Sequence, residues 1–141
     1  MLKKSGENGM ERWIEVFAGK IPKAVYQMQL INGEKQGLTI ELSCNHTCVM
    51  IKFGIVQAVR ILDEGIVQSN LYCDNEIKKY KDNNFQNIIY EVQEGEFGKQ
   101  ISQISEGYEE CLNLKHYVVI TPNYNVDIIT EWEPTIEISR T

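Results

Sequence analysis

The sequence predicts an α+β fold that is mainly antiparallel β-structure, with about seven to nine short strands and two helices in one sheet-rich domain. Apolar and polar side chains alternate along much of residues 26–72, as they do in strands with one face on a core. Turn-forming residues separate these runs. Residues 12–17 and 98–113 instead carry apolar side chains at helical spacing.

The first predicted element is a short N-terminal helix. Trp13, Val16 and Phe17 follow the spacing of one helical face, and Trp13 and Phe17 are expected to pack on the sheet. Asn8 is a suitable cap for the first turn, and Glu11 stands at the capping-box position.

Side-chain parity then predicts the lengths of two hairpin loops, because a slip of one residue sends every side chain to the wrong face. The first hairpin requires an odd loop, such as residues 33–35, and the second an even loop, such as Asn45-His46. With these loops, one face collects the apolar residues Tyr26, Met28, Leu30, Leu38, Ile40, Leu42, Val49, Ile51 and Phe53.

The remaining elements follow from the same patterns. Strands are predicted at 56–62, 66–72, 88–92, 117–120 and 126–130, with an extended segment around Ile136 and Ile138. Residues 63–65 read as a turn and residues 74–86 as a polar surface loop. The second helix is predicted at 98–113, with apolar residues on one face and glutamates opposite.

Composition restricts the class of protein. A chain of 141 residues with 43% hydrophobic and 24% charged residues predicts a single globular domain, residues 1–141. There is no apolar run of membrane-spanning length and no apolar leader after the first lysines, so we expect a cytoplasmic protein with reduced cysteines.

The formal charge of −6 is concentrated in the second half of the chain. Residues 1–70 hold eight Lys/Arg and seven Asp/Glu, net +1, whereas residues 71–141 hold six and thirteen, net −7. This balance argues against nucleic acid and membrane as partners and favours a basic protein. The alternative is a solvated acidic face that keeps the protein soluble.

Motifs for metal, cofactor and catalytic sites are weak. Cys44 and Cys48 have a metal-like spacing, but parity places them on opposite faces and no second ligand pair occurs, so we predict no metal, cofactor or catalytic residue. An enzyme or ligand-binding domain with a pocket near His46 or His116 is the alternative, and Cys111 could meet His116. Carboxylate pairs for glycoside hydrolysis are also possible among Glu94, Glu96, Asp127, Glu131 and Glu133.

The clearest candidate for binding is a group of acidic and aromatic residues in the second half of the chain. Trp132 is either core under the C-terminal strand or, if exposed, an interface anchor between two glutamates. The candidate partner-binding residues are Glu94, Glu96, Glu106, Tyr108, Glu109, Glu110, Glu131, Trp132 and Glu133.

Two stretches of the chain carry a family resemblance. The opening pattern Trp13…Val16-Phe17…Gly19…Ile21-Pro22, Tyr26-x-Met28-x-Leu30 and Leu38-x-Ile40-x-Leu42 resembles the start of small bacterial immunity-type proteins found beside polymorphic toxins. The segments Tyr117–Ile120 and Val126–Ile129 are similar to their closing hairpin. The resemblance implies a compact, mostly β protein that neutralises a partner, such as a toxin domain, by binding it.

The first hypothesis is therefore a non-catalytic binding protein of immunity type that covers a basic protein partner with its acidic surface. The second is the small enzyme or ligand-binding domain with its pocket near a histidine. The third is a structural domain that forms a homodimer or larger assembly by pairing edge strands.

Overall fold

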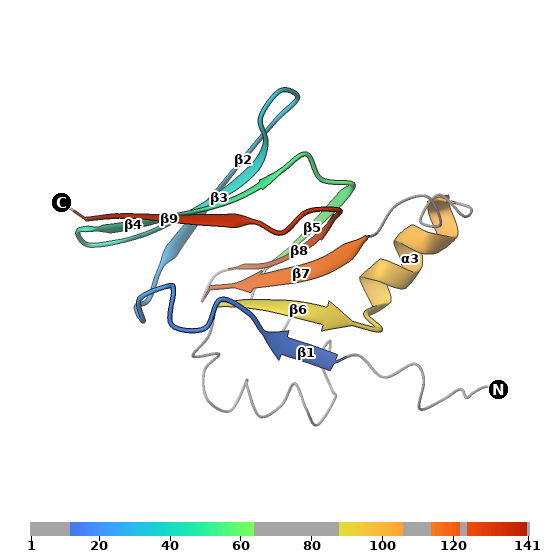
Figure 1. Ribbon diagram of the computed structural model, residues 1–141, viewed down its shortest axis with the longest axis horizontal. Coiled ribbons are helices and arrows are strands. Elements are labelled where there is room, and N and C mark those ends of the chain that lie inside the picture. Colours follow the sequence, from blue (N-terminus) through green and yellow to red (C-terminus); the bar gives the residue numbers. More distant parts are fainter. Residues whose placement is uncertain (1–11, 64–87, 106–113, 122–123, 141) are drawn as a thin grey trace.

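The computed structural model describes residues 12–63, 88–105, 114–121 and 124–140 and shows two antiparallel β-sheets packed face to face (Figure 1). Sheet A has the strand order β1-β6-β7-β8-β5, and sheet B has the order β2-β3-β4-β9. The strands of sheet A are β1 (Arg12–Glu15), β5 (Ala58–Asp63), β6 (Ile89–Gln93), β7 (Lys115–Ile120) and β8 (Tyr124–Thr130). Those of sheet B are β2 (Gln27–Gly33), β3 (Gly37–Cys44), β4 (Thr47–Gly54) and β9 (Thr135–Arg140).

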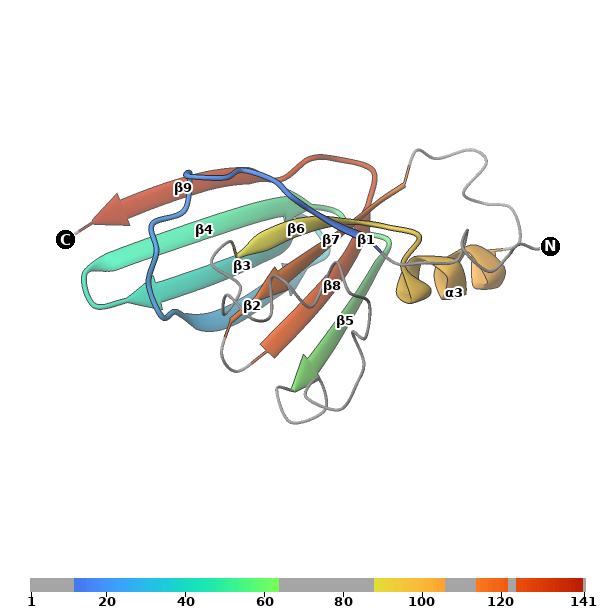
Figure 2. The same ribbon diagram turned by 90° about the horizontal axis from the view of Figure 1, so that it is seen from below.

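The main core lies between the two sheets, and Figure 2 shows their strands crossing at an angle. Alternating residues of the strands other than β1 face this core, as expected for sheets that bury one side. Its members are Tyr26, Leu38, Ile40, Leu42, Val49, Ile51, Phe53, Ile88, Ile89, Tyr117, Val119, Val126 and Ile128. The predicted apolar face of β2, β3 and β4 is thus confirmed, and Met28 and Leu30 of β2 are partly buried against the main core.

Both hairpin loops have the predicted parity. Gly33 pairs with Gly37, which leaves an odd loop of residues 34–36, one position later than the example 33–35. Cys44 pairs with Thr47, so the even loop is Asn45-His46, and Asn45 takes the positive φ of 52° that this tight turn requires. A loop of the wrong parity would have turned the apolar side chains of one strand to solvent.

The predicted N-terminal helix is wrong, because residues 12–15 form β1, which pairs with β6 along Trp13↔Val92. Trp13 is nevertheless buried, as expected of core, and its ring lies 5.4 Å from the ring of Tyr90. Phe17 ends the segment in a turn with φ of 55° and is partly buried against the main core. Pairing with β6 satisfies the backbone of this segment, and that outcome depends on a strand more than seventy residues away in the chain.

The second predicted helix is confirmed in part as α3 (Glu96–Ser105), which begins two residues earlier than expected and lies at one end of the molecule (Figure 1). Residues 106–113 of that prediction lie outside the described residues, as do the predicted strand at 66–72 and the loop at 74–86. The strands predicted near 56–62, 88–92, 117–120 and 126–130 and the extended segment near 136–138 correspond to β5, β6, β7, β8 and β9.

The face of sheet A that points away from sheet B is also buried. A second apolar cluster covers part of it, formed by Trp13, Tyr90, Val92, Val118 and Ile120 with Leu62 against it. Within the described ranges, the one helix is too short to cross a membrane. This second buried face of sheet A carries the polar residues described next.

Candidate functional site

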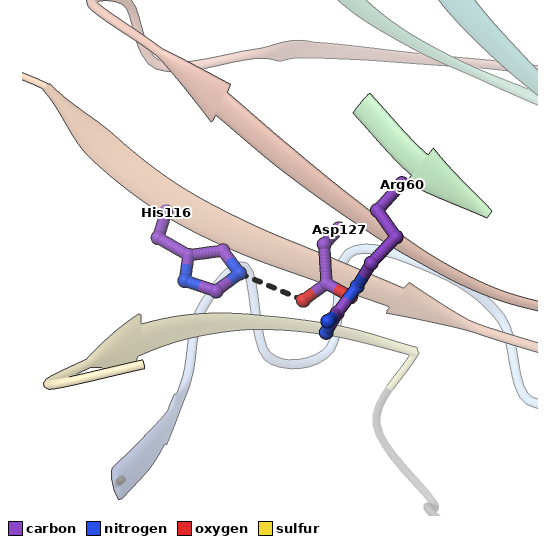
Figure 3. A network of polar contacts seen from close by, with 3 residues as sticks. All are labelled: Arg60, His116 and Asp127. Carbon is purple, nitrogen blue, oxygen red and sulfur yellow. Dashed lines mark hydrogen bonds and ion pairs between the residues drawn. The ribbon is translucent and has the colours of Figure 1, made fainter. Parts of the chain in front are cut away.

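Three side chains from neighbouring strands of sheet A form a buried polar network (Figure 3). Asp127 on β8 accepts two hydrogen bonds on Oδ2 from Arg60 of β5, from Nη2 at 2.9 Å and from Nε at 3.1 Å. Its other oxygen, Oδ1, accepts a hydrogen bond of 2.7 Å from Nε2 of His116 on β7. Asp127 is 1% exposed and His116 is 7% exposed, so the carboxylate joins three strands in a place that solvent barely reaches.

Strand register explains why these residues meet. Arg60 lies directly opposite Asp127 in the β5–β8 pair, and His116 lies one diagonal step away, opposite Ile129. All three side chains point away from the main core, because their strand neighbours Val59, Tyr117 and Val126 or Ile128 point into it. A buried carboxylate requires charged or hydrogen-bonding partners, and Arg60 and His116 supply them.

The start of α3 covers the imidazole of His116. A Cβ atom placed on Gly95 would lie 2.7 Å from Nδ1 of His116, so a residue without a side chain permits this close approach. The ring of Phe97 meets the imidazole edge-on at 6.0 Å, and Cζ of Arg60 lies 4.9 Å from the centre of the Phe97 ring. The network therefore also anchors the helix to the sheet.

One nitrogen of the network, Nδ1 of His116, has no hydrogen-bond partner among the described residues. The other ring nitrogen, Nε2, donates to the carboxylate of Asp127. An imidazole oriented by a carboxylate is the arrangement of a general base or of a ligand-binding histidine. Here Nδ1 is buried, and Gly95 lies against it.

The sequence pointed to only part of this network. His116 stood as a candidate pocket residue and Asp127 as one of several carboxylates, whereas Arg60 was missed. A usable signal was present, because Asp127 lies within the apolar run 126–129, where a carboxylate needs a buried partner. The identity of that partner depends on the strand order, which the sequence does not reveal.

Four of the predicted partner-binding residues gather at one end of sheet A. Glu94 follows β6, and Glu131, Trp132 and Glu133 follow β8. Both strands run antiparallel to β7, which lies between them. Their C-terminal ends therefore lie at the same end of the sheet, about 10 Å apart. We call Glu94, Glu131, Trp132 and Glu133 the acidic end. The cations Arg12 and Lys115 also lie at this end of sheet A.

Trp132 is 61% exposed, so the interpretation of this residue as core under the C-terminal strand is wrong. It lies in the connection from β8 to β9, where the chain passes from sheet A to sheet B. Thr130 before it and Pro134 after it are buried, and the Trp132 backbone N–H donates to Oγ1 of Thr130 at 3.4 Å. Nε2 of Gln57 donates to Glu131 at 3.4 Å. The exposed indole therefore projects from a connection whose two ends are fixed in the protein.

Glu133 of the acidic end also affects the pKa of the buried phenol of Tyr117. Burial is the largest cause that raises the pKa of Tyr117 to about 12, and the negative charges of Glu91 and Glu133 contribute to the same rise. Tyr117 is 1% exposed and faces the main core. Glu133 is thus close enough to the sandwich interior to influence a core residue while its own side chain is exposed.

The other predicted site residues are more dispersed. Glu96 is the first residue of α3, and Glu106, Tyr108, Glu109, Glu110 and Cys111 lie outside the described residues. His46 is exposed at the tip of the β3–β4 hairpin, which does not enclose it. A hollow of about 330 Å³ lies elsewhere, lined by Asn32, Gly33, Glu34, Ile55 and Val56.

Cys44 and Cys48 are free thiols at the base of the β3–β4 turn. Cys44 is packed against the main core, while Cys48 pairs with the exposed Ser43, so the predicted placement on opposite faces is confirmed. Among the residues that the structure describes, no group of three or more metal-ligating side chains comes together.

Comparisons with protein-family models, with curated proteins and with solved structures found no match to this chain.

Proposed function

We propose that the protein is a non-catalytic binding protein of immunity type, which covers a basic surface of a protein partner with its acidic end. The observation that carries the proposal is the exposed Trp132, 61% accessible and held between two buried residues. Tryptophan is enriched among the few residues that carry most of the binding energy at protein interfaces, and a backbone that is already fixed lowers the entropy cost of binding.

Charge supports the same choice of partner. Glu94 and Glu133 are exposed at the same end of sheet A as Trp132, and the chain has a net charge of −6. Complementary charge increases the association rate and selects against acidic partners, while the desolvated aromatic supplies affinity. Arg12 lies at the same end of sheet A, where its guanidinium donates a hydrogen bond of 2.9 Å to the side-chain oxygen of Gln93. Proteins with a patch of Lys and Arg are therefore the expected partners.

The test is a comparative pull-down from the native host, with bound proteins identified by mass spectrometry. Trp132→Ala and the pair Glu94→Lys and Glu133→Lys should each lose a basic protein that wild type retains. Glu34→Lys, an exposed acid in the β2–β3 loop, is the matched charge control and should retain it. The expected loss of affinity for Trp132→Ala is roughly 30-fold or more, typical of a hot-spot residue.

The salt dependence of affinity, measured with the purified protein and its purified partner, distinguishes electrostatic attraction from non-specific apolar binding. Wild-type affinity should fall between about 50 and about 500 mM salt, and the Glu94→Lys/Glu133→Lys variant should show a weaker dependence. A partner bound equally well by wild type, Trp132→Ala and the double charge reversal would refute the proposal.

The His116–Asp127 pair favours a second candidate function, a ligand-binding or catalytic site that uses the unpaired Nδ1. Fragment screening by ligand-observed NMR would test it, with His116→Gln as the comparison. A fragment that binds wild type and is lost from His116→Gln would support this function. Equal binding to both proteins would remove His116 from consideration.

A further inference from the structure

Among the residues that the structure describes, β2 differs from the other three strands at the edges of the two sheets. Residues 24–33, which contain β2, carry no charged side chain over ten positions. The other edge strands are β1, β5 and β9, and each contains charged residues: Arg12 and Glu15, Arg60 and Asp63, and Glu137 and Arg140. Charged residues on an edge strand are a common means of preventing unwanted pairing, because an open edge presents unpaired backbone donors and acceptors.

The outward face of β2 also exposes aliphatic side chains. Since Met28 and Leu30 pack against the main core, the odd-numbered residues of this segment face away from it. Val25 is 74% exposed and Ile31 is 49% exposed, and Gln27 and Gln29 lie between them. An uncharged edge with a β-branched residue at each end is well suited to accept another strand.

We propose that β2 pairs antiparallel with β2 of a second copy of this chain about a twofold axis, which would join two four-stranded B sheets into one sheet of eight strands. Parity restricts the register, because facing residues must point to the same side. With Met28 of the two copies opposite each other, Gln27 faces the partner's Gln29 and Val25 faces the partner's Ile31. This register covers all four exposed aliphatic side chains and keeps Met28 and Leu30 on the core side.

Charge indicates where two copies can meet, and self-complementarity indicates that the occupant is a second copy. Two copies of a chain with net charge −6 repel each other, so contact is favoured where neither copy presents charge. A twofold interface is formed by the same patch on both molecules and must therefore complement itself, as residues 25–31 do in this register. At β9, Glu137 already pairs with Lys52 at 3.0 Å, and a twofold pairing there would bury Glu137 and Arg140.

The experiment is sedimentation equilibrium of the full chain from about 1 to about 500 µM, which distinguishes monomer from dimer by mass action. Wild type should dimerise, and Ile31→Lys should weaken dimerisation at least tenfold because each copy places an ammonium opposite Val25 of the other. Ile138→Lys, the same change at a 40% exposed position on β9, is the matched control and should dimerise as wild type does. Gln29→Lys repeats the test in case Ile31→Lys unfolds.

Amide hydrogen exchange locates the contact. Exchange at residues 25–31 should become slower as protein concentration rises, while exchange at residues 135–140 should not change. A chain that stays monomeric over the whole range would overturn the proposal. A dimer that Ile31→Lys and Gln29→Lys leave intact, or that Ile138→Lys weakens instead, would overturn it as well.

Discussion

At the scale of single residues, Asp127 is a buried carboxylate on which the polar network of sheet A is centred. It is 1% exposed, and its two oxygens accept hydrogen bonds from Arg60 and His116 on different strands. Removing one member of a buried ionic network costs far more than breaking a pair in solvent, because the remaining charge stays buried without compensation. The stability of sheet A around β8 should therefore depend on this carboxylate.

Replacing Asp127 by Asn should lower the free energy of unfolding by roughly 2–4 kcal/mol, since the shape is kept while the charge facing Arg60 is lost. Urea unfolding at neutral pH measures this effect. Glu137→Gln is the control, because Glu137 pairs with Lys52 on the exposed surface and should cost less than about 1 kcal/mol. Equal losses in the two variants would show that the network contributes no more than a surface ion pair.

Tyr117 makes stability depend on alkaline pH. The unfolded chain releases the phenolic proton near pH 10, whereas burial and the carboxylates of Glu91 and Glu133 raise the pKa of Tyr117 to about 12 in the folded protein. The unfolded state therefore binds fewer protons between these values, and the free energy of unfolding falls as pH rises through them, by up to roughly 2–3 kcal/mol.

Comparing wild type with Tyr117→Phe by denaturant unfolding from about pH 8 to about pH 11.5 tests this linkage. The variant should lose less stability over the alkaline part of the range. Tyr124→Phe, at a 38% exposed tyrosine, controls for general alkaline effects and should follow wild type. Parallel curves for wild type and Tyr117→Phe would contradict the assigned pKa.

At the scale of elements, contact between α3 and sheet A depends on the size of one residue. Gly95 precedes the helix, and a Cβ there would lie 2.7 Å from Nδ1 of His116 and 2.8 Å from Cγ1 of Val92. Gly98 lies within α3, and a Cβ there would meet Nδ1 of His116 at 3.7 Å, an ordinary contact. The two glycines thus have different roles despite being three residues apart.

Gly95→Ala and Gly98→Ala should change stability in opposite directions. Gly95→Ala should cost about 1–3 kcal/mol, because the methyl group displaces the buried imidazole. Gly98→Ala should stabilise by up to about 1 kcal/mol, because alanine favours the helix and has room. Thermal unfolding of both variants provides the comparison. A stable Gly95→Ala protein would mean that α3 can move off His116 without loss.

Elements also differ in how well local patterns predicted them. Loop parity in the two hairpins followed from Ile40 and its alternating neighbours, since a hairpin is settled by contacts near in sequence. The spacing of Trp13, Val16 and Phe17 fits a helix equally well as a sequence pattern, yet β6 recruits residues 12–15 as a strand. Such pairing is non-local, and tertiary contacts override helical propensity.

At the scale of the whole molecule, the described strands alternate between the sheets three times along the chain: after β1 into sheet B, after β4 into sheet A, and after β8 back into sheet B. Neither sheet is built from one continuous segment, and both supply the main core. The two layers are therefore expected to unfold together, as a single cooperative unit.

Ile51→Ala on β4 of sheet B tests this cooperativity. The substitution should cost about 2–5 kcal/mol, because Ile51 is 0% exposed. In a Trp132→Phe background, Trp13 fluorescence reports on sheet A, and its midpoint should shift together with the far-ultraviolet circular dichroism. Ile61→Ala, at a 50% exposed position, should cost much less. A shift in circular dichroism without one in fluorescence would mean that the sheets unfold separately.

The sequence by itself determined the antiparallel strands from β2 to β4, their facing apolar residues and their loop parity, because these depend on alternation along neighbouring segments. Only the tertiary structure decided that the strands form two layers, that residues 12–15 pair with β6, and that Arg60, Asp127 and His116 meet. It also decided that Trp132 is exposed, since burial of a connection depends on which strands it joins and where they lie. Short-range patterning specifies the faces of a strand, and strand order, a long-range property, specifies what each face touches.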